Sequence, residues 1–212
     1  MLQLSSIGLY KKEVFMLFNL SSRGATVVAL SALLLTSTMA VAQSGSGSAV
    51  AEVEVGHLRL VDDLDRPEDG YCLDILGSGQ YVRFDMPMSA HNCKPGLYHD
   101  EAVIFESNGR IRFPAYNACA TAAGINKSVL AGAAVMPREC GERSPFLEAD
   151  SLQRFIHRKD GRIELAGSGL CMTVGQESDS TFDETHRWRT LFMAHCEQAD
   201  LSHSQWHVVV PE

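Results

Sequence analysis

The chain contains 212 residues, of which 45% are hydrophobic and 8% are aromatic, and it carries a formal net charge of −8 at neutral pH. This length and composition fit one globular domain of ordinary size. A net negative charge is not typical of nucleic-acid-binding proteins, which carry clusters of basic residues, and it provides no attraction to anionic lipid surfaces. We therefore expect neither a nucleic-acid partner nor binding to a charged membrane.

Residues 1–42 have the pattern of a secretory signal peptide. Arg23 precedes an apolar run at Ala25–Leu35, and Ala40–Ala42 forms an A-x-A cleavage site. The run is shorter than the roughly twenty apolar residues that a membrane-spanning helix needs, so no membrane span is expected. A retained anchor helix is the alternative, and Met16 would also serve as the start of such a signal. We predict an exported protein, either secreted or periplasmic.

Residues 43–51 are rich in serine and glycine, which is the composition of a flexible linker. The folded domain is expected over residues 52–212, and this part of the chain contains all six cysteines. Export would place these cysteines in a compartment where disulfides form and persist.

Within this domain, short β-prone segments alternate with turns. Asn108-Gly109 and Asp160-Gly161 are strong hairpin signals, and each precedes a segment of alternating polar and apolar residues. The expected strand segments are 53–55, 58–60, 71–75, 81–84, 102–105, 110–113, 119–121, 129–136, 153–156, 162–165, 171–174, 189–193 and 205–208. Short strands of this kind, without an amphipathic helical stripe, predict an all-β fold.

One stretch of the chain occurs twice. Val103–Thr121 aligns without a gap on Phe155–Thr173, and a more divergent third copy surrounds Cys72. The identical positions are Ile104/Ile156, Gly109/Gly161, Arg110/Arg162, Ile111/Ile163, Cys119/Cys171 and Thr121/Thr173. Self-similarity with a period of about fifty residues is typical of repeat architectures. We expect repeats at about 53–105, 106–157 and 158–210, each of about four strands, which close into a threefold barrel without exposed sheet edges.

The cysteines fall into one pair per expected repeat. If each repeat is a structural unit, the disulfides are Cys72–Cys93, Cys119–Cys140 and Cys171–Cys196. Each would contribute roughly 3 kcal/mol to stability in the chain-entropy model. Pairing between repeats, or two unpaired thiols, is the alternative. We expect no metal site, because no cysteine or histidine pair has zinc-ligand spacing.

Each repeat combines a C-x-D/T motif, a second cysteine, a position related to Q-x-W and a D/N-G-x-I turn. This combination resembles the ricin B-type lectin family over about residues 55–210. The Q-x-W positions are 101–103, 153–155 and 204–206, and only the third retains the tryptophan. The resemblance implies a disulfide-stapled β-trefoil. It also implies that three large apolar residues plug the core near the threefold axis: Val103, Phe155 and Trp206.

The resemblance further implies a carbohydrate-binding site in the first repeat. In this family an aspartate after the first cysteine binds vicinal sugar hydroxyls, an aromatic residue before the second cysteine stacks on the sugar, and an asparagine precedes Q-x-W. The corresponding residues here are Asp74, His91 and Asp100. A few polar groups beside an apolar wall are typical of small-ligand sites. The alternative for Asp74 is a turn residue that bonds the backbone of Gly77–Gly79.

The second and third repeats lack this pattern. Thr121 and Thr173 stand at the two aspartate positions, and the stacking positions hold residues that are not aromatic. We therefore expect no sugar site in either repeat. The third repeat carries an insertion at 176–187, after which Trp188 either lies exposed on a contact loop or begins a core strand.

No G-x-S-x-G nucleophile elbow occurs, and no pair of carboxylates stands out for glycoside hydrolysis. We therefore predict no enzymatic activity and no cofactor. The predicted function is that of a secreted, lectin-like protein whose partner is a glycan or glycoprotein. The alternative is a protein-binding β-trefoil with degenerate sugar pockets. It would be a receptor-binding or scaffold subunit of a secreted toxin, or a protease inhibitor, and would act on a partner protein.

Overall fold

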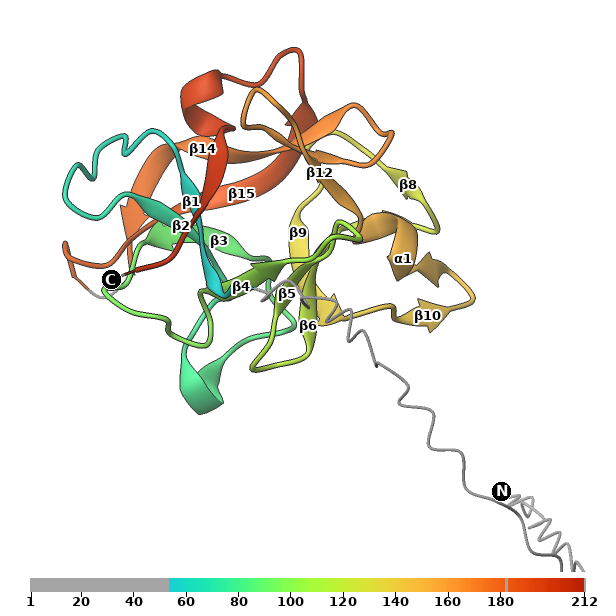
Figure 1. The fold of residues 1–212 in the computed structure, drawn as a ribbon, viewed down its shortest axis with the longest axis horizontal. Coiled ribbons are helices and arrows are strands. Elements are labelled where there is room, and N and C mark those ends of the chain that lie inside the picture. Colours follow the sequence, from blue (N-terminus) through green and yellow to red (C-terminus); the bar gives the residue numbers. More distant parts are fainter. Residues whose placement is uncertain (1–53, 182, 212) are drawn as a thin grey trace, which may run out of the picture. The chain divides into compact units, whose positions relative to one another are not determined.

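The computed structural model describes residues 54–181 and 183–211 (Figure 1). The predicted signal peptide at 1–42, the linker at 43–51 and the alternative start at Met16 lie outside these described residues. Among the described residues, no helix has both the length and the apolar character needed to cross a membrane.

The described chain consists mainly of short strands, which confirms the all-β prediction (Figure 1). The strands are β1 (Gly56–Leu60), β2 (Tyr71–Asp74), β3 (Ser89–Asn92), β4 (Ala102–Phe105), β5 (Ile111–Phe113), β6 (Ala118–Ala122), β7 (Gly124–Ile125), β8 (Ser128–Val129), β9 (Val135–Glu139), β10 (Arg143–Ser144), β11 (Leu147–Glu148), β12 (Phe155–His157), β13 (Ile163–Leu165), β14 (Leu170–Ser180), β15 (Arg187–His195) and β16 (Trp206–Val209). The helical segments are η1 (Gly79–Tyr81), α1 (Ala149–Leu152) and η2 (Leu201–His203).

Most strands join one large antiparallel sheet. Its order is β12-β13-β14-β15-β3-β2-β1-β4-β5-β6-β9, and β16 also pairs with β1. The first and last strands of the domain therefore lie side by side (Figure 1), with His57 opposite Val209 and Leu60 opposite Trp206. This pairing fixes both ends of the folded chain against each other.

The three predicted core plugs make similar backbone contacts. Val103 pairs with Gly56, while the amides of Phe155 and Trp206 donate to the carbonyls of Gly109 and Gly161, both at 2.8 Å. The glycine is required at position 109, because its φ is +90° and an added Cβ would lie 2.6 Å from the Phe155 carbonyl oxygen. Each plug thus pairs with a glycine, which belongs to strand β1 for Val103 and to a turn for Phe155 and Trp206.

All three plugs lie in the hydrophobic core. Val103, Phe155 and Trp206 are 0%, 2% and 1% exposed, and they belong to one buried cluster. The Trp206 indole nitrogen donates to the Met172 carbonyl at 3.0 Å, so the largest plug also satisfies its polar atom.

The predicted disulfide pairing is confirmed. Bonds join Cys72 to Cys93, Cys119 to Cys140 and Cys171 to Cys196, so neither pairing between repeats nor an unpaired thiol occurs among these residues. Each bond ties a strand to the residue that follows its antiparallel partner strand: β2 with β3, β6 with β9, and β14 with β15.

Three strand predictions are wrong. In segment 53–55, residues 54 and 55 precede β1 and lie in no strand, and residue 53 lies outside the described residues. Segment 81–84 is not a strand, because Tyr81 ends η1 and the chain continues as a loop to Phe84; these two side chains are 74% and 44% exposed. Segment 129–136 is interrupted between β8 and β9, where Leu130 is exposed and Gly132 has a φ of +88°. The positive φ turns the chain away from an extended conformation, which the apolar composition did not reveal.

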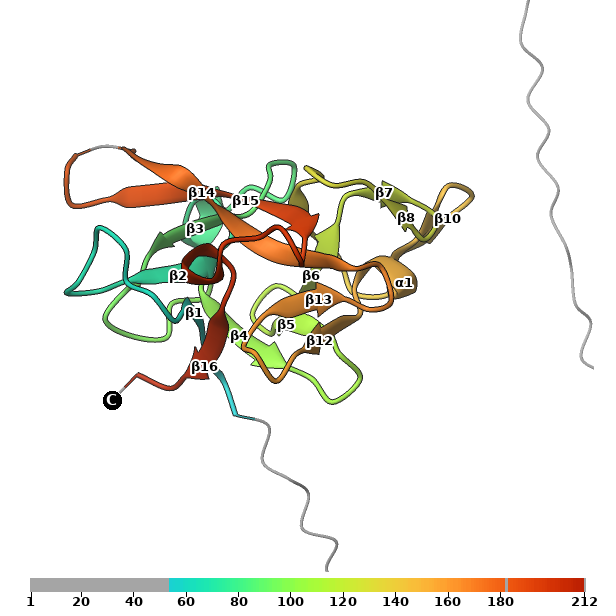
Figure 2. The ribbon, with the colours of Figure 1, turned by 90° about the horizontal axis from the view of Figure 1, so that it is seen from above.

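The insertion of the third repeat forms strand as well as turn. β14 continues to Ser180, after an irregularity between Val174 and Ser178, and β15 begins at Arg187. The start of β15 also pairs with β3, with Trp188 opposite His91 (Figure 2). The long β14–β15 hairpin therefore reaches the strands of the first repeat.

Candidate functional site

The three predicted carbohydrate-binding residues line one cavity of about 360 Å³, which we call the polar cavity. Asp74, His91 and Asp100 come from the first repeat, together with Lys94. Thr181, His186 and Trp188 come from the β14–β15 hairpin and complete the wall. The cavity is thus assembled from two parts of the chain that are distant in sequence.

The β2–β3 pair places the first residues of the site. Asp74 ends β2 opposite Ser89, and His91 lies opposite Cys72, whose disulfide to Cys93 holds the end of the pair together. The Asp100 carbonyl accepts the Ile75 amide at 3.0 Å, and this hydrogen bond places Asp100 beside the end of β2. The site therefore rests on a hydrogen-bonded and cross-linked frame.

Lys94 connects the two aspartates. Its ammonium group donates to Asp74 Oδ2 at 2.7 Å and to Asp100 Oδ2 at 2.6 Å. Asp74 and Asp100 are only 4% and 2% exposed. Asp74 thus contacts a side chain in the cavity rather than the backbone of Gly77–Gly79, which was the alternative from the sequence.

Glu101 adds a third carboxyl group behind the aspartates. Its side chain is fully buried, Oε2 accepts the Lys94 amide at 2.9 Å, and Oε1 has no hydrogen-bond partner among the described residues. Burial raises the pKa of Glu101 to about 8, although the Lys94 charge opposes this shift. Burial likewise raises the pKa of Asp74 to about 7 against the effect of Lys94, and Asp100 adds to the rise.

The cation of the cluster is held in its charged form. Burial lowers the pKa of Lys94, but the nearby charges of Asp74 and Glu101 outweigh burial and raise it above its ordinary value. One ammonium group therefore faces three carboxyl groups, two of which have raised pKa values. The cavity offers both donors and acceptors to a ligand rich in hydroxyl groups.

The aromatic side of the cavity differs from the sequence expectation. His91 occupies the predicted stacking position, but its Nδ1 donates to the Asn92 carbonyl at 2.9 Å, and its ring lies 5.7 Å from that of His186. Burial lowers the pKa of His91, so the neutral ring is favoured. Trp188, which pairs with His91 across β15 and β3, supplies the large aromatic wall.

An ion pair between Asp65 and Arg189 holds the hairpin in this position. Asp65 accepts hydrogen bonds from Arg189 at 2.6 Å, from Tyr71 at 2.8 Å and from Ser178 at 2.5 Å. Arg189 also lies over the Tyr71 ring, 5.0 Å from its centre, and is itself buried. Burial raises the pKa of Asp65, but the three hydrogen bonds outweigh it and hold that pKa well below its usual range.

In the other two repeats, the residues at the position of Asp74 are threonines that form hydrogen bonds within the protein. Thr121 is buried, donates to the Cys119 carbonyl at 3.0 Å and accepts from Gln153 at 2.9 Å. Thr173 is buried and donates to the Cys171 carbonyl at 3.1 Å. These threonines therefore belong to the scaffold.

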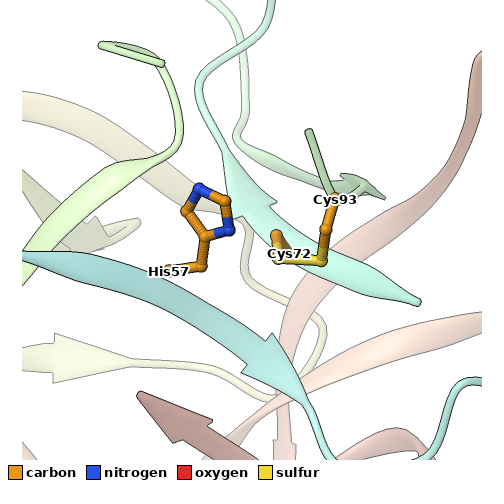
Figure 3. A group of neighbouring side chains, drawn as sticks. All are labelled: His57, Cys72 and Cys93. Carbon is orange, nitrogen blue, oxygen red and sulfur yellow. A yellow bond between two sulfur atoms is a disulfide. The ribbon is translucent and has the colours of Figure 1, made fainter. Parts of the chain in front are cut away.

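Among the residues that the structure describes, two clusters have the residue types of a metal site. His57 lies beside Cys72 and Cys93 (Figure 3), but the two sulfur atoms form a disulfide and are not thiolate ligands. In the second cluster, ligand atoms of Asp74, His91 and Glu101 lie within 4.8 Å of one another. The Lys94 ammonium already donates to Asp74 in this second group, so a metal ion bound to that carboxyl oxygen would have to displace it.

Sequence reasoning missed Lys94, Glu101, His186 and Trp188 as parts of the site. The available signals were the position of Lys94 directly after Cys93, and an acid in place of the Q-x-W glutamine. Nothing in the local sequence shows that Trp188 lies opposite His91, because that contact depends on the pairing of β15 with β3.

No protein-family model matches the chain, and no curated protein matches it. Among solved structures, it is similar to the agglutinin from Abrus precatorius, with a TM-score of 0.52 and 19% identity over 76% of this chain. The match covers 51% of the agglutinin, so this chain spans about half of its length. It is also similar to the mdaA-1 domain, with a TM-score of 0.53 and 16% identity over 74% of this chain and 90% of that domain.

A weaker likeness connects the chain with the β-trefoil lectin of the Vibrio vulnificus hemolysin/cytolysin, which was solved with N-acetyl-D-lactosamine bound. Its TM-score is 0.46, with 13% identity over 74% of this chain and 95% of that one. The strand architecture and the first two likenesses show the fold to be a β-trefoil, as the sequence resemblance predicted.

Proposed function

We propose that this protein is a non-catalytic, lectin-like β-trefoil that binds a glycan through a single site, the polar cavity of the first repeat. The observation that carries this proposal is the convergence of Asp74, His91 and Asp100 on one cavity. The equivalent threonines of the other repeats are used up in internal hydrogen bonds. One site per chain implies weak binding unless the glycan or the protein is multivalent.

The chemistry of the cavity suits a sugar. The carboxyl oxygens of Asp74 and Asp100 can accept hydrogen bonds from sugar hydroxyl groups, and the Lys94 ammonium can donate to the ring or hydroxyl oxygens of the sugar. The Trp188 ring can cover the apolar C–H face of the sugar. The Lys94 ammonium bridges the two carboxyl groups at 2.7 and 2.6 Å and fixes their positions in the cavity, which suits the binding of a polar ligand.

Under the same proposal, the protein acts outside the cytoplasm. Three disulfides support this, because such bonds persist mainly in oxidising compartments. Export through the predicted N-terminal signal peptide is part of the same proposal, and the mature N-terminus of the protein collected from the producing cells tests it. Cleavage after Ala42 is the expected result.

A glycan array tests the function directly. The oxidised protein should bind a restricted set of glycans, Asp74→Asn should lose that binding, and Glu148→Gln should keep it. The Glu148 substitution is a matched control because it removes one exposed carboxylate from a strand outside the cavity. An array without signal at high protein concentration, or equal binding by both variants, contradicts the proposal.

A protein partner is the second candidate, and exposed aromatic side chains favour it. Tyr81, Phe84 and Tyr98 are 74%, 44% and 51% exposed, and all three lie in connections between strands of the first repeat. Exposed aromatic groups are common anchors of protein interfaces. Binding of a protein ligand that survives Asp74→Asn but is lost in Tyr81→Ser would favour this second candidate.

A further inference from the structure

A second cavity adjoins the polar cavity and has the opposite character. This apolar groove has a volume of about 620 Å³, and its lining includes Met86, Met88, Leu191 and Phe192. Met88 and Leu191 are only 2% and 3% exposed, while Met86 is 39% exposed at the surface. Methionine side chains adapt to irregular apolar ligands, which suits such a lining.

The two cavities share part of their walls. Leu76, Ser89, Thr181 and Trp188 line both of them. The Trp188 side chain thus borders both the cluster around Lys94 and the groove around Phe192. A ligand that fills the polar cavity can extend past Trp188 into the groove without leaving the surface of the protein.

The groove is held by backbone contacts between different parts of the fold. The Met88 amide donates to the Val135 carbonyl at 2.8 Å, the Gly132 amide donates to the Met193 carbonyl at 2.7 Å, and Ala134 bridges to Phe192. The floor and walls therefore belong to a hydrogen-bonded frame. A preformed apolar cavity of this kind gains affinity by burying an apolar ligand group.

We propose that the natural ligand is a glycoside with an apolar aglycone, whose sugar lies in the polar cavity and whose alkyl or aryl group lies in the apolar groove. This inference rests on the proposed glycan binding. A further sugar would be a poor occupant of the groove, because its hydroxyl groups would lose hydrogen bonds with water against an apolar lining. An alkyl chain loses no such bonds and gains from burial.

Titration calorimetry with matched glycosides tests the inference. The probes are methyl and octyl β-glycosides of glucose, galactose, mannose and N-acetylglucosamine, kept below their micelle concentrations, with octanol as the control for the chain alone. For the sugar that binds, the octyl glycoside should bind roughly tenfold tighter or more than the methyl glycoside, given the apolar area it buries. Octanol alone should bind much more weakly than the octyl glycoside.

A variant pair locates the effect. Met86→Asp places a charge in the groove at a surface position and should remove the octyl advantage while leaving methyl-glycoside affinity unchanged. Leu201→Asp is the control, because Leu201 is 50% exposed and lines neither cavity. The comparison of methyl and octyl probes on the unaltered protein stands even where Met86→Asp fails to fold.

The outcomes separate this inference from the proposed function. If methyl and octyl glycosides bind equally, the inference is overturned and the glycan-binding proposal stands. If octanol binds as tightly as every octyl glycoside and Asp74→Asn changes nothing, both proposals are overturned. If the octyl glycoside still binds more tightly than the methyl glycoside in Met86→Asp, the aglycone does not lie in the groove and the assignment is overturned. If the unaltered protein is a dimer that Met86→Asp converts to a monomer, the assignment is also overturned, since a second copy of the chain would then occupy the groove.

Discussion

At the residue scale, Glu101 and Gln153 occupy equivalent positions and have different consequences. Gln153 Oε1 accepts the Gly141 amide at 2.8 Å, and its Nε2 donates to Thr121 at 2.9 Å. Glu101 Oε2 accepts the Lys94 amide in the same way, but Oε1 has no proton to donate when ionised and has no partner among the described residues. Above its raised pKa of about 8, the acid therefore carries a buried charge where the other repeat has a neutral amide.

The first prediction concerns this acid. Glu101→Gln should stabilise the protein by about 1–3 kcal/mol at pH 8, because it removes the cost of a buried, unsatisfied charged group. The folded pKa of about 8 lies above the ordinary value of 4.5, so the wild-type protein holds a proton that the unfolded chain releases. Wild-type stability from this group therefore falls as pH rises from about 4.5 to about 8.

Denaturant unfolding between pH 4 and pH 9 measures that prediction. The stability gap between the variant and the wild type should widen with pH across this window. Glu197→Gln, which removes an exposed carboxylate, serves as the control and should show no such gap. A gap that is constant with pH would contradict the assignment of the buried charge to Glu101.

The second prediction concerns the cation. Lys94→Met should destabilise the protein by about 3–5 kcal/mol at neutral pH, because it leaves Asp74 and Asp100 as buried charges without a partner. Lowering the pH protonates Asp74, whose pKa is raised to about 7, so the loss should shrink in acid. Lys159→Met removes an exposed lysine and is the matched control. Thermal melts at pH 4 and pH 8 decide the question, and an equal loss at both pH values is the contrary outcome.

At the element scale, the β14–β15 hairpin connects the third repeat with the site of the first. The amide of Arg187 donates to Asn92 Oδ1 across 95 positions of the chain, and Ser178 donates to Asp65 across 113. The hairpin carries Thr181, His186 and Trp188 into the polar cavity. Its attachment to β3 therefore controls the shape of the cavity as much as the strands of the first repeat do.

The third prediction concerns this attachment. Asp65→Asn should cost roughly 1–2 kcal/mol, at the low end for charged hydrogen bonds because the Asp65 side chain is 41% exposed. Amide hydrogen exchange should accelerate at Arg187 and Trp188, where the hairpin meets β3. Glu177→Gln, an exposed substitution on β14, should leave these amides protected. Unchanged protection in Asp65→Asn would show that strand pairing alone holds the hairpin.

At the scale of the whole molecule, two long-range strand pairings of β1 help to close the fold. β1 pairs with both β4 and β16, and the plugs Phe155 and Trp206 hydrogen-bond to turn glycines. The disulfides add a covalent link at similar places, beside β3, β9 and β15. Because the strand pairings, the plugs and the disulfides hold the core, the loops and the hairpin insertion can differ in sequence and length without loss of the core.

The fourth prediction tests the core. Phe155→Ala should cost about 3–5 kcal/mol, because a fully buried aromatic side chain is lost and a cavity remains. Leu201→Ala, at a position that is 50% exposed, should have little effect. Chemical unfolding of the oxidised protein measures both. Near-wild-type stability of Phe155→Ala would contradict its place as a core plug.

Most of the fold could be predicted from the sequence, because the residues that specify it recur at a regular spacing along the chain. The duplicated stretch, the paired cysteines and the plug positions each act within one repeat, and a regular spacing reveals them without knowledge of distant contacts. Asp74, His91 and Asp100 were proposed as a group in the same way, since all three belong to one repeat. Segment 81–84 was misassigned because its composition suits a strand while both of its aromatic side chains face solvent.

The composition of the site was decided only by tertiary structure. Lys94 meets Asp74 because the disulfide and the β2–β3 pairing bring them together, and Trp188 meets His91 because β15 adds to the edge of β3. Side-chain charge and burial in the cavity depend on all of these neighbours at once, so the raised pKa values of Asp74 and Glu101 have no local signature. Periodicity along the chain thus specifies the scaffold, whereas contacts between non-equivalent positions of different repeats specify the cavity.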